Sequence, residues 1–424
     1  MRAALAAALA ATVVCVLSAL SAQDELRVPL ERTRILEKPA AAAAAREATL
    51  LDDAPQGVKP RAGDGWFFVL RRPPAAERDE NAPVEKGDRA GMLLAGRDGM
   101  RLCFDTDGDL DLRDEKPLEG RAVRVAGRDC VLFRVTGVVR DPREKAGGFA
   151  VFVAAPKEEP ESVLIMPAAA VCGRLAVAGR EVEVGLLRAE PAAEASERAL
   201  LLFDADGDGR FGQAEHALLP GGRLFWGETC FLPEVREKDG ELRLVFRRPE
   251  PPKGAKRLKS TLTLEQDGAT CLPRDGVLLL PGGRLKPGAR LSGSRVGADG
   301  AEWLMIRTVA KAVEAKDGDA LEFGPVKLRL SAEAADGGLL LKGRIEAADG
   351  GAIEMFRDGL YAPTVRLEIR NSAGEVVRSV ALTPDVSGVC TYRRRATAAP
   401  FTAVLRLPEG CPFRADADVV ESGR

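Results

Sequence analysis

A twelve-residue segment in the middle of the chain carries acidic side chains at the spacing that a hard cation requires. Asp204, Asp206 and Asp208 stand at its positions 1, 3 and 5, and Glu215 stands at position 12. Calcium takes six to eight oxygen ligands at about 2.3–2.6 Å, and a twelve-residue loop supplies them from positions 1, 3, 5, 7, 9 and 12. Arg210 at position 7 would offer its backbone carbonyl, with its charged side chain turned away. We therefore predict a calcium site formed by these five residues.

A second acidic segment begins 99 residues earlier and repeats the start of this pattern. Its positions 1, 3, 5 and 7 are Asp105, Asp107, Asp109 and Asp111. Position 6 is Leu110 instead of glycine and position 12 is Lys116, so Asp114 or Glu115 would have to close the coordination shell. This segment is either a second calcium site with altered geometry or an Asp-Gly turn after a strand. The matched Phe-Asp-x-Asp-Gly-Asp starts indicate either duplication of a β unit or reuse of one turn chemistry.

Electrostatics links these acidic segments to a bound ion. Four or more carboxylates within a few ångströms repel one another and resist ionising together unless a cation lies between them. Exported calcium modules bind at about 10⁻⁴–10⁻³ M, and free ion at ten times the dissociation constant adds about 1.4 kcal/mol to folding. We expect calcium to act as a structural brace.

The segment that begins at Asp204 resembles the calcium loop of EF-hand proteins, over these twelve residues and their flanks only. It departs at position 8, where Phe211 replaces the usual aliphatic residue, and the preceding 198–203 fits a strand as readily as a helix. It is similar in this respect to the loops of secreted bacterial proteins, dockerin-like repeats included. The resemblance implies structural calcium in loops set among strands.

The first 22 residues are typical of a secretory signal peptide. Arg2 precedes an uncharged stretch rich in Ala, Leu and Val, and the small residues at its end suit cleavage after Ala22 or Ser21. An uncleaved anchor is the alternative, because the apolar run approaches the ~18 residues that a spanning helix needs. We expect a chain that is secreted, periplasmic or held at the cell envelope, with no membrane span beyond the signal segment.

Residue usage excludes several classes of function. The 62 Lys and Arg residues nearly balance the 64 Asp and Glu residues, so no basic nucleic-acid-binding surface is expected. The single histidine, His216, excludes zinc sites that need two or three imidazoles. We expect His216 to lie at the surface or at a helix end rather than to act in catalysis.

Seven cysteines remain after the signal segment, and their scattered spacing excludes a zinc ribbon and a thioredoxin-type redox site. Cys390 and Cys411 flank a predicted hairpin of 391–395 with 402–407. They either form a disulfide across it or remain small buried hydrophobic residues.

The rest of the sequence predicts a mainly β, multi-domain protein. Short segments alternate apolar and polar residues between turns, as at 326–330, and one helix is expected from Pro39 to Leu51. Turn signals every eight to twelve residues in the tail predict an Ig-like β-sandwich. The predicted parts are a signal peptide (1–22), a helical or extended segment (23–63), a β-rich region with both acidic loops (64–248), a Pro-rich linker (249–257), a β-rich segment (258–316) and the β-sandwich (317–424).

Two functions fit these features. The first is an exported calcium-binding protein that serves as a binding or scaffold component, with an unknown protein or a cell-envelope structure as its partner, and that is not an enzyme. The second is a secreted hydrolase stabilised by calcium, with an active site that the sequence does not reveal. A glycosidase needs two carboxylates on opposite sides of a sugar, and nothing among the 64 acidic residues selects such a pair.

Overall fold

The computed structural model describes residues 25–40, 46–70, 84, 88–96, 99–125, 128–138, 149–158, 161–177, 179–187, 200–218, 222–238, 241–335, 338–362, 365–382, 384, 389–395 and 400–422. Strands dominate, and the one helical element among these residues is the 3-10 turn η2 (Pro281–Gly283). The predicted mainly β, multi-domain fold is confirmed. Nothing helical in the described chain is long and apolar enough to cross a bilayer. The predicted signal peptide lies outside the described residues.

The first of two similar modules has two antiparallel sheets over one apolar core. Its strands are β3 (Arg46–Thr49), β4 (Gly65–Leu70), β5 (Arg89–Gly96), β6 (Gly99–Phe104), β7 (Leu118–Glu119), β8 (Arg121–Val125), β9 (Arg128–Val138), β10 (Phe149–Pro156) and β11 (Ser162–Pro167). The sheet orders are β4-β5-β6-β7 and β3-β11-β10-β9-β8. Phe68, Phe104 and Phe133 are buried between the sheets, and burial of each such side chain contributes roughly 1.5–3 kcal/mol. This core fixes the strand that leads into the first acidic loop.

The second module repeats this order of strands. Its strands are β1 (Glu25–Pro29), β2 (Arg32–Ile35), β12 (Ala169–Val177), β13 (Arg180–Leu187), β14 (Leu200–Phe203), β15 (His216–Leu218), β16 (Arg223–Trp226), β17 (Thr229–Lys238) and β18 (Glu241–Arg247). The neighbours β12-β13-β14-β15 correspond to β4-β5-β6-β7, and β16-β17-β18 correspond to β8-β9-β10. In each module the third strand of this order, β6 or β14, leads into an acidic loop. The loop follows Phe104 in the first module and Phe203 in the second. The shared order favours duplication of a β unit.

A central region continues the sheet of the second module. Its elements are β19 (Lys256–Lys259), β20 (Thr263–Gln266), β21 (Ala269–Leu272), β22 (Val277–Leu280), β23 (Arg284–Leu285), β24 (Arg290–Val296), β25 (Glu302–Thr308), β26 (Val313–Glu314), β29 (Ile353–Arg357) and β30 (Leu360–Tyr361). Parallel pairing of β16 with β21 creates a ten-stranded sheet, β1-β18-β17-β16-β21-β20-β24-β25-β29-β30. The segment 249–257 leads from β18 of this sheet into β19, which pairs with β22 in a separate two-stranded sheet. The hairpin β29–β30, from within 317–424, belongs to the ten-stranded sheet.

The C-terminal part is a sandwich of two four-stranded sheets. Its strands are β27 (Val326–Ala335), β28 (Gly338–Ala347), β31 (Val365–Arg370), β32 (Val376–Leu382), β33 (Val389–Arg395), β34 (Phe401–Arg406), β35 (Ala415–Ala417) and β36 (Val419–Ser422). The sheet orders are β33-β28-β27-β35 and β32-β31-β34-β36. Val326, Leu328 and Leu330 face the shared core, which confirms the alternation predicted there.

The predicted hairpin near the C-terminus is wrong, because its two strands lie in different sheets. β33 pairs with β28, whereas β34 pairs with β31 and β36, so the chain crosses the sandwich between them. Cys390 is buried in β33 and its Sγ lies 3.9 Å from the Leu382 carbonyl oxygen, while Cys411 is partly buried after β34. The structure has no disulfide between them. Their alternative role as small apolar side chains is the observed one.

The N-terminal segment is extended where the structure describes it. The end of the predicted helix forms β3, whose residues pair with β11 from Thr49↔Ser162 to Arg46↔Ile165. An alanine-rich helix would bury little apolar surface, whereas the strand pairing places Ala48 in the core of the first module. Residues 41–45 of the predicted helix lie outside the described chain.

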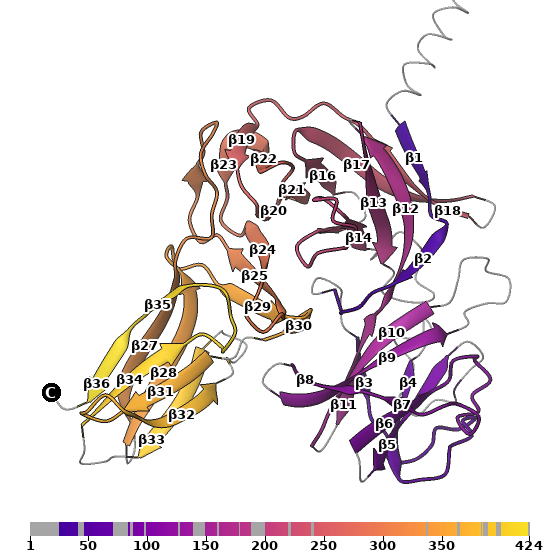
Figure 1. The fold of residues 1–424 in the computed structure, drawn as a ribbon, viewed down its shortest axis with the longest axis horizontal. Coiled ribbons are helices and arrows are strands. Elements are labelled where there is room, and N and C mark those ends of the chain that lie inside the picture. Colours follow the sequence, from indigo (N-terminus) through magenta and orange to yellow (C-terminus); the bar gives the residue numbers. More distant parts are fainter. Residues whose placement is uncertain are drawn as a thin grey trace, which may run out of the picture.

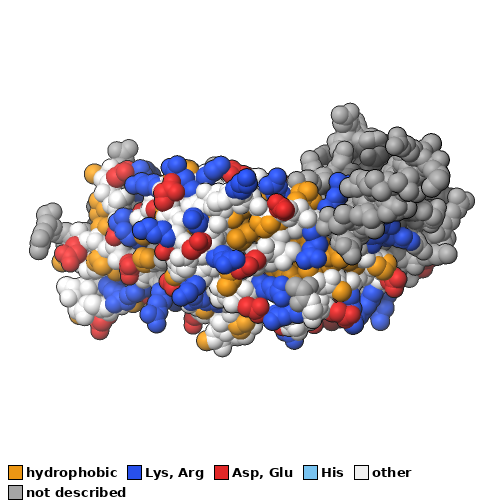
Figure 2. Space-filling view, turned by 90° about the horizontal axis from the view of Figure 1, so that it is seen from above, with side chains coloured by type: hydrophobic (Ala, Val, Ile, Leu, Met, Phe, Trp, Pro, Cys, Tyr) orange, Lys and Arg blue, Asp and Glu red, His pale blue; other side chains and the backbone are white. Residues whose placement is uncertain are grey.

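The β29–β30 hairpin connects the central sheet to the first module (Figure 1). Leu360 packs in one cluster with side chains of β9 and β10. Asp358 forms an ion pair with Lys38 at 2.6 Å, and a Cβ at Gly359 would lie 1.7 Å from the Pro39 carbonyl oxygen. Figure 2 shows Lys and Arg interspersed with Asp and Glu over the described surface of one face, as the net charge of −2 leads one to expect.

Candidate metal centres

Both acidic loops begin where a buried strand ends. Asp105 follows β6 and is 0% exposed, and Asp204 follows β14 and is 4% exposed. The N–H of Asp105 donates to the Ala90 carbonyl at 2.9 Å, and the N–H of Asp204 donates to the Glu183 carbonyl at 3.0 Å. The sheet therefore extends into the first residue of each loop and holds its carboxylate at the inner end.

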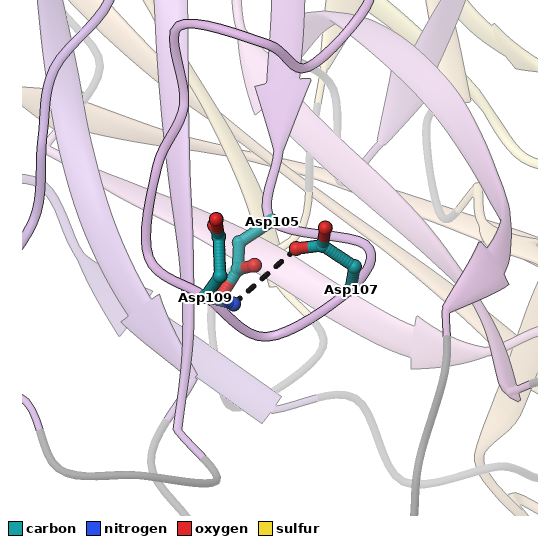
Figure 3. A group of neighbouring side chains, drawn as sticks. All are labelled: Asp105, Asp107 and Asp109. Carbon is teal, nitrogen blue, oxygen red and sulfur yellow. Dashed lines mark hydrogen bonds between the residues drawn. The ribbon is translucent and has the colours of Figure 1, made fainter. Parts of the chain in front are cut away.

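Three carboxylates of the first loop converge. One oxygen each of Asp105, Asp107 and Asp109 lies within 4.8 Å of the others, and Figure 3 shows the three side chains gathered in the turn after β6. Asp105 Oδ1 accepts a hydrogen bond from the Gly108 N–H at 2.7 Å, but its Oδ2 is buried and accepts none. Burial raises the pKa of Asp105, although the Gly108 N–H and the Arg89 guanidinium act to lower it. A buried acceptor without a donor is costly, and a cation beside it would remove that cost.

The first loop closes one residue earlier than the second. Glu115, its eleventh residue, accepts hydrogen bonds from the N–H and the hydroxyl of Thr106, the hydroxyl lying 2.8 Å from Oε1. Leu110 has a φ of 63° where Gly209 of the second loop has 79°. This left-handed conformation costs a non-glycine residue roughly 1–2 kcal/mol. Glu115 therefore spans the loop by way of Thr106, but its carboxylate, predicted as a ligand, lies outside the group of three that converge.

Asp111, predicted as a ligand, lies outside the converging group. Its Oδ2 pairs with Lys59 at 3.2 Å, and it also bonds Arg113. The Arg113 hydrogen bond holds the pKa of Asp111 well below its usual range, against the raising effect of burial. Position 7 of the first loop is therefore already neutralised by neighbouring cations.

The second loop brings together Asp204, Asp206 and Glu215, again with one oxygen of each within 4.8 Å of the others. Glu215 Oε1 accepts the N–H groups of Ala205 at 2.8 Å and Asp206 at 3.1 Å, and Oε2 accepts that of Gly212 at 2.8 Å. Burial raises the pKa of Glu215 to about 7 despite these donors, and the charge of Asp206 adds to the rise. Burial also raises the pKa of Asp204. A cation would reverse both shifts, since it favours the ionised form.

Of the other two predicted ligands, Asp208 lies outside this group of side chains, whereas Arg210 is predicted to offer its backbone carbonyl; both residues shape the turn. Asp206 Oδ1 accepts the Asp208 N–H at 3.0 Å, and Asp208 Oδ1 accepts the Arg210 N–H at 2.7 Å. The same i to i+2 bonds run through 107–111 in the first loop. Such side-chain bonds to the backbone curl a chain into successive turns. The two loops thus share one backbone design, and both acidic groups could hold a metal ion.

The end of the second loop contacts two distant parts of the chain. Gln213 donates its backbone N–H to Glu302 at 3.2 Å and its side-chain amide to the Pro39 carbonyl at 3.1 Å. Arg34 of β2 donates to the carbonyl of the loop's sixth residue at 2.8 Å, and its guanidinium lies 5.2 Å from the Phe211 ring. The N-terminal segment and β25 therefore meet at this loop, where they border a cleft of about 900 Å³.

His216 is buried at 5% exposure in β15, so its predicted surface or helix-end position is wrong. Pairing of β15 with β14, His216↔Leu202, draws it inside. Its Nδ1 lies 3.2 Å from the Gln213 carbonyl oxygen, and its Nε2 lies 3.4 Å from Glu265 Oε1. Burial raises the pKa of Glu265, but the hydrogen bond and charge of His216 together with the charge of Arg290 lower it by more. Both ring nitrogens of His216 therefore lie against oxygen atoms of the protein, as expected for a histidine with a structural role.

Sequence reasoning missed Thr106 and Gln213. The Gln213 partners are 174 and 89 residues away, so no local pattern could identify them. Thr106 lies inside the predicted loop, but its bond to Glu115 depends on the shortened closure.

Comparison with protein-family models gives no match to this chain, and a search of the curated proteins finds no significant match either. The geometry of the two loops is therefore the basis for the function assigned below.

Proposed function

We propose that this chain is an exported calcium-binding protein in which calcium braces the β modules, and that it serves as a binding or scaffold component at the cell envelope or outside the cell. The observation that carries the proposal is the buried Asp105 Oδ2, which accepts no hydrogen bond within a group of three converging carboxylates. Support from the second loop comes from Glu215, whose pKa burial raises to about 7. Each loop holds acidic groups that a cation would stabilise.

The donor chemistry favours calcium over other ions. The converging side-chain atoms of both groups are carboxylate oxygens, with no His or Cys among them. Hard cations prefer such ligands, whereas zinc and copper prefer nitrogen or sulfur. The EF-hand-like spacing from Asp204 to Glu215 adds backbone carbonyls, which suit the flexible six-to-eight-fold shell of calcium better than the strict octahedron of magnesium.

The contacts of the second loop support a bracing role. Gln213 and Arg34 connect this loop to the N-terminal segment and to β25. Without an ion, repulsion among Asp204, Asp206 and Glu215 would loosen the turn that positions these contacts. Calcium would therefore stabilise the joint between segments as well as the loop.

Calorimetric titration of calcium into the chelated full chain tests the proposal. We expect two binding events in the wild type, loss of one in Glu215→Gln and loss of the other in Asp105→Asn. Asp416→Asn, an exposed carboxylate on β35, is the matched control and should bind as the wild type does. Absence of heat from the wild type at millimolar calcium would refute calcium binding.

Export has a separate test. When the full chain is expressed in a bacterial host, the N-terminal sequence of the extracellular or periplasmic product should begin at Gln23 or Ala22. A chain found only in the cytoplasm with Met1 retained would count against export, and an exported chain that retains Met1 would indicate an uncleaved anchor; neither result affects the calcium proposal.

A further inference from the structure

A second cleft, of about 540 Å³, lies between the first module and the C-terminal sandwich. Residues of β8 and of the turn after β10 form one side, and residues of β31, β32 and the segment after β34 form the other. Residues of β29 and β30, Asp129 of β9 and Trp303 of β25 also line it. Clefts of about 300–1,000 Å³ at boundaries between domains are common binding sites for small molecules. None of the acidic-loop residues lines this cleft.

The charged residues of this cleft have an excess of cations. The lining contains five basic residues, Arg121, Arg124, Lys157, Arg357 and Arg366, and three acidic residues, Asp129, Asp358 and Glu409. The formal sum is therefore 5 − 3 = +2. The basic residues come from separate elements, β8, the turn after β10, β29 and β31, and converge only in the folded chain.

The three carboxylates are already committed to other cations. The pairs are Asp358 with Lys38 at 2.6 Å, Glu409 with Arg366 at 3.1 Å and Asp129 with Arg124 at 3.8 Å. Outside the lining, Asp299 pairs with Arg357 at 2.6 Å. Within the described part of the chain, no ion pair within 4.0 Å involves Arg121 or Lys157, although the charge of Arg121 helps to lower the pKa of Asp358. These two cations account for the excess charge.

The other eight lining residues of this cleft are apolar. The apolar lining residues are Ala122, Val123, Trp303, Leu360, Ala362, Val365, Ala381 and Pro408. Trp303 is 1% exposed, and the Arg357 guanidinium lies 5.6 Å from its ring centroid. A cleft lined by both cations and apolar side chains matches a ligand that has an anionic head and an apolar body.

We propose that this cleft binds a small organic anion, with a phosphate or carboxylate head held by Arg121 and Lys157 and an apolar body against the neighbouring side chains. The site requires no calcium. It supplies a specific ligand class for the binding role of the chain, while its geometry is independent of both acidic loops.

The test is calorimetric and fluorescence titration of the full chain with four probes: phenyl phosphate, benzoate, inorganic phosphate and uncharged benzyl alcohol. Trp303 provides the fluorescence signal, and Trp303→Phe assigns it. We expect an aromatic anion to bind with a Kd of about 1 mM or tighter, and the tighter of the two identifies the head group. Inorganic phosphate should bind more weakly, because it lacks the apolar body, and benzyl alcohol should not saturate.

The variant Arg121→Gln/Lys157→Gln removes the two exposed cations of the cleft. It should lower the affinity for the aromatic anion at least tenfold, because charge-assisted hydrogen bonds are lost. Arg174→Gln/Lys316→Gln removes the same charge from the exposed surface elsewhere and should leave the affinity unchanged. Affinity in Glu215→Gln should equal that of the wild type, which separates this site from the calcium sites. Absence of saturable binding up to 10 mM of either aromatic anion, or equal affinity in the cleft variant and the wild type, would overturn the proposal.

Discussion

Lowering the pH should release calcium from the second loop, because calcium and a proton compete for Glu215. Burial raises the pKa of this carboxyl to about 7 in the ion-free loop. With one proton displaced, the apparent Kd is multiplied by 1 + 10^(pKa − pH), which is about 1.1 at pH 8 and about 11 at pH 6. We therefore expect binding about tenfold weaker at pH 6 than at pH 8, a difference of about 1.4 kcal/mol.

The raised pKa of Glu215 also affects the stability of the chelated protein. This stability should fall as the pH rises, whereas calcium affinity should increase. The pKa of Glu215 rises on folding from 4.5 to about 7, so its contribution is fully present below pH 4.5 and is lost as the pH rises through 7. The chelated wild type should therefore become less stable between pH 5 and pH 8. The calcium-loaded protein should keep its stability over this pH range, because the ion stabilises the ionised carboxylate of Glu215. Chelated Glu215→Gln should lack this pH dependence.

The assay isolates the second loop with the background variant Asp107→Asn/Asp109→Asn, which removes two exposed carboxylates of the first loop. Calorimetry at pH 6, 7 and 8, in two buffers with different ionisation enthalpies, gives the Kd and the protons released, which should be about 0.5 at pH 7. Adding Glu215→Gln to this background should abolish the remaining binding event at all three pH values. If calcium binds with equal affinity within twofold at pH 6 and pH 8, burial does not hold a proton on Glu215 and the reasoning is refuted.

Three further substitutions test the structure around the loops. Gly209→Ala puts a side chain at φ 79° with nothing described within 4 Å of its Cβ, so urea unfolding of the chelated chain should show a loss of about 1–2 kcal/mol from conformation alone; an unchanged midpoint would contradict this. Gly359→Ala puts a Cβ 1.7 Å from the Pro39 carbonyl oxygen, so hydrogen exchange in the N-terminal segment should accelerate, and wild-type exchange there would mean that the contact is not tight. Trp226→Phe removes the indole hydrogen bond to the Ala205 carbonyl at 3.2 Å. Urea unfolding should show that the free energy of unfolding falls by about 1–3 kcal/mol. The affinity of the second loop for calcium should also fall, and an affinity equal to that of the wild type would show that this hydrogen bond does not position the loop.

The acidic loops were predictable because their geometry is mostly local. Three converging side chains in each loop lie within twelve residues of one another, and the i to i+2 bonds depend only on Asp spacing. The closure of the first loop was ambiguous for a physical reason. The sequence alone does not show that Thr106 supplies both an N–H and a hydroxyl to Glu115, which hold that carboxylate outside the group of three that converge.

The errors all concern contacts between distant segments. Period-2 alternation predicts that 326–330 is a strand with one buried face, and it is. The same rule does not say which neighbour a strand pairs with, so β33 and β34 read as a hairpin although they lie in opposite sheets. His216 is buried because β15 pairs with β14 and because Glu265 approaches from β20. No local signal carries either fact.

The two loops share a backbone design but differ in the residues that surround them. Calcium is therefore expected to stabilise a different part of the chain at each loop. The first loop contains Leu110 in a left-handed conformation, and position 7 is occupied by an ion pair with Lys59 of the same module. Calcium there would offset local strain and repulsion within one module. The second loop has glycine at the strained position and is bonded by Gln213 and Arg34 to segments outside its own turn. An ion at the second loop therefore acts on the joint between the N-terminal segment and the central sheet, so its removal should loosen the arrangement of the modules more than removal of the first.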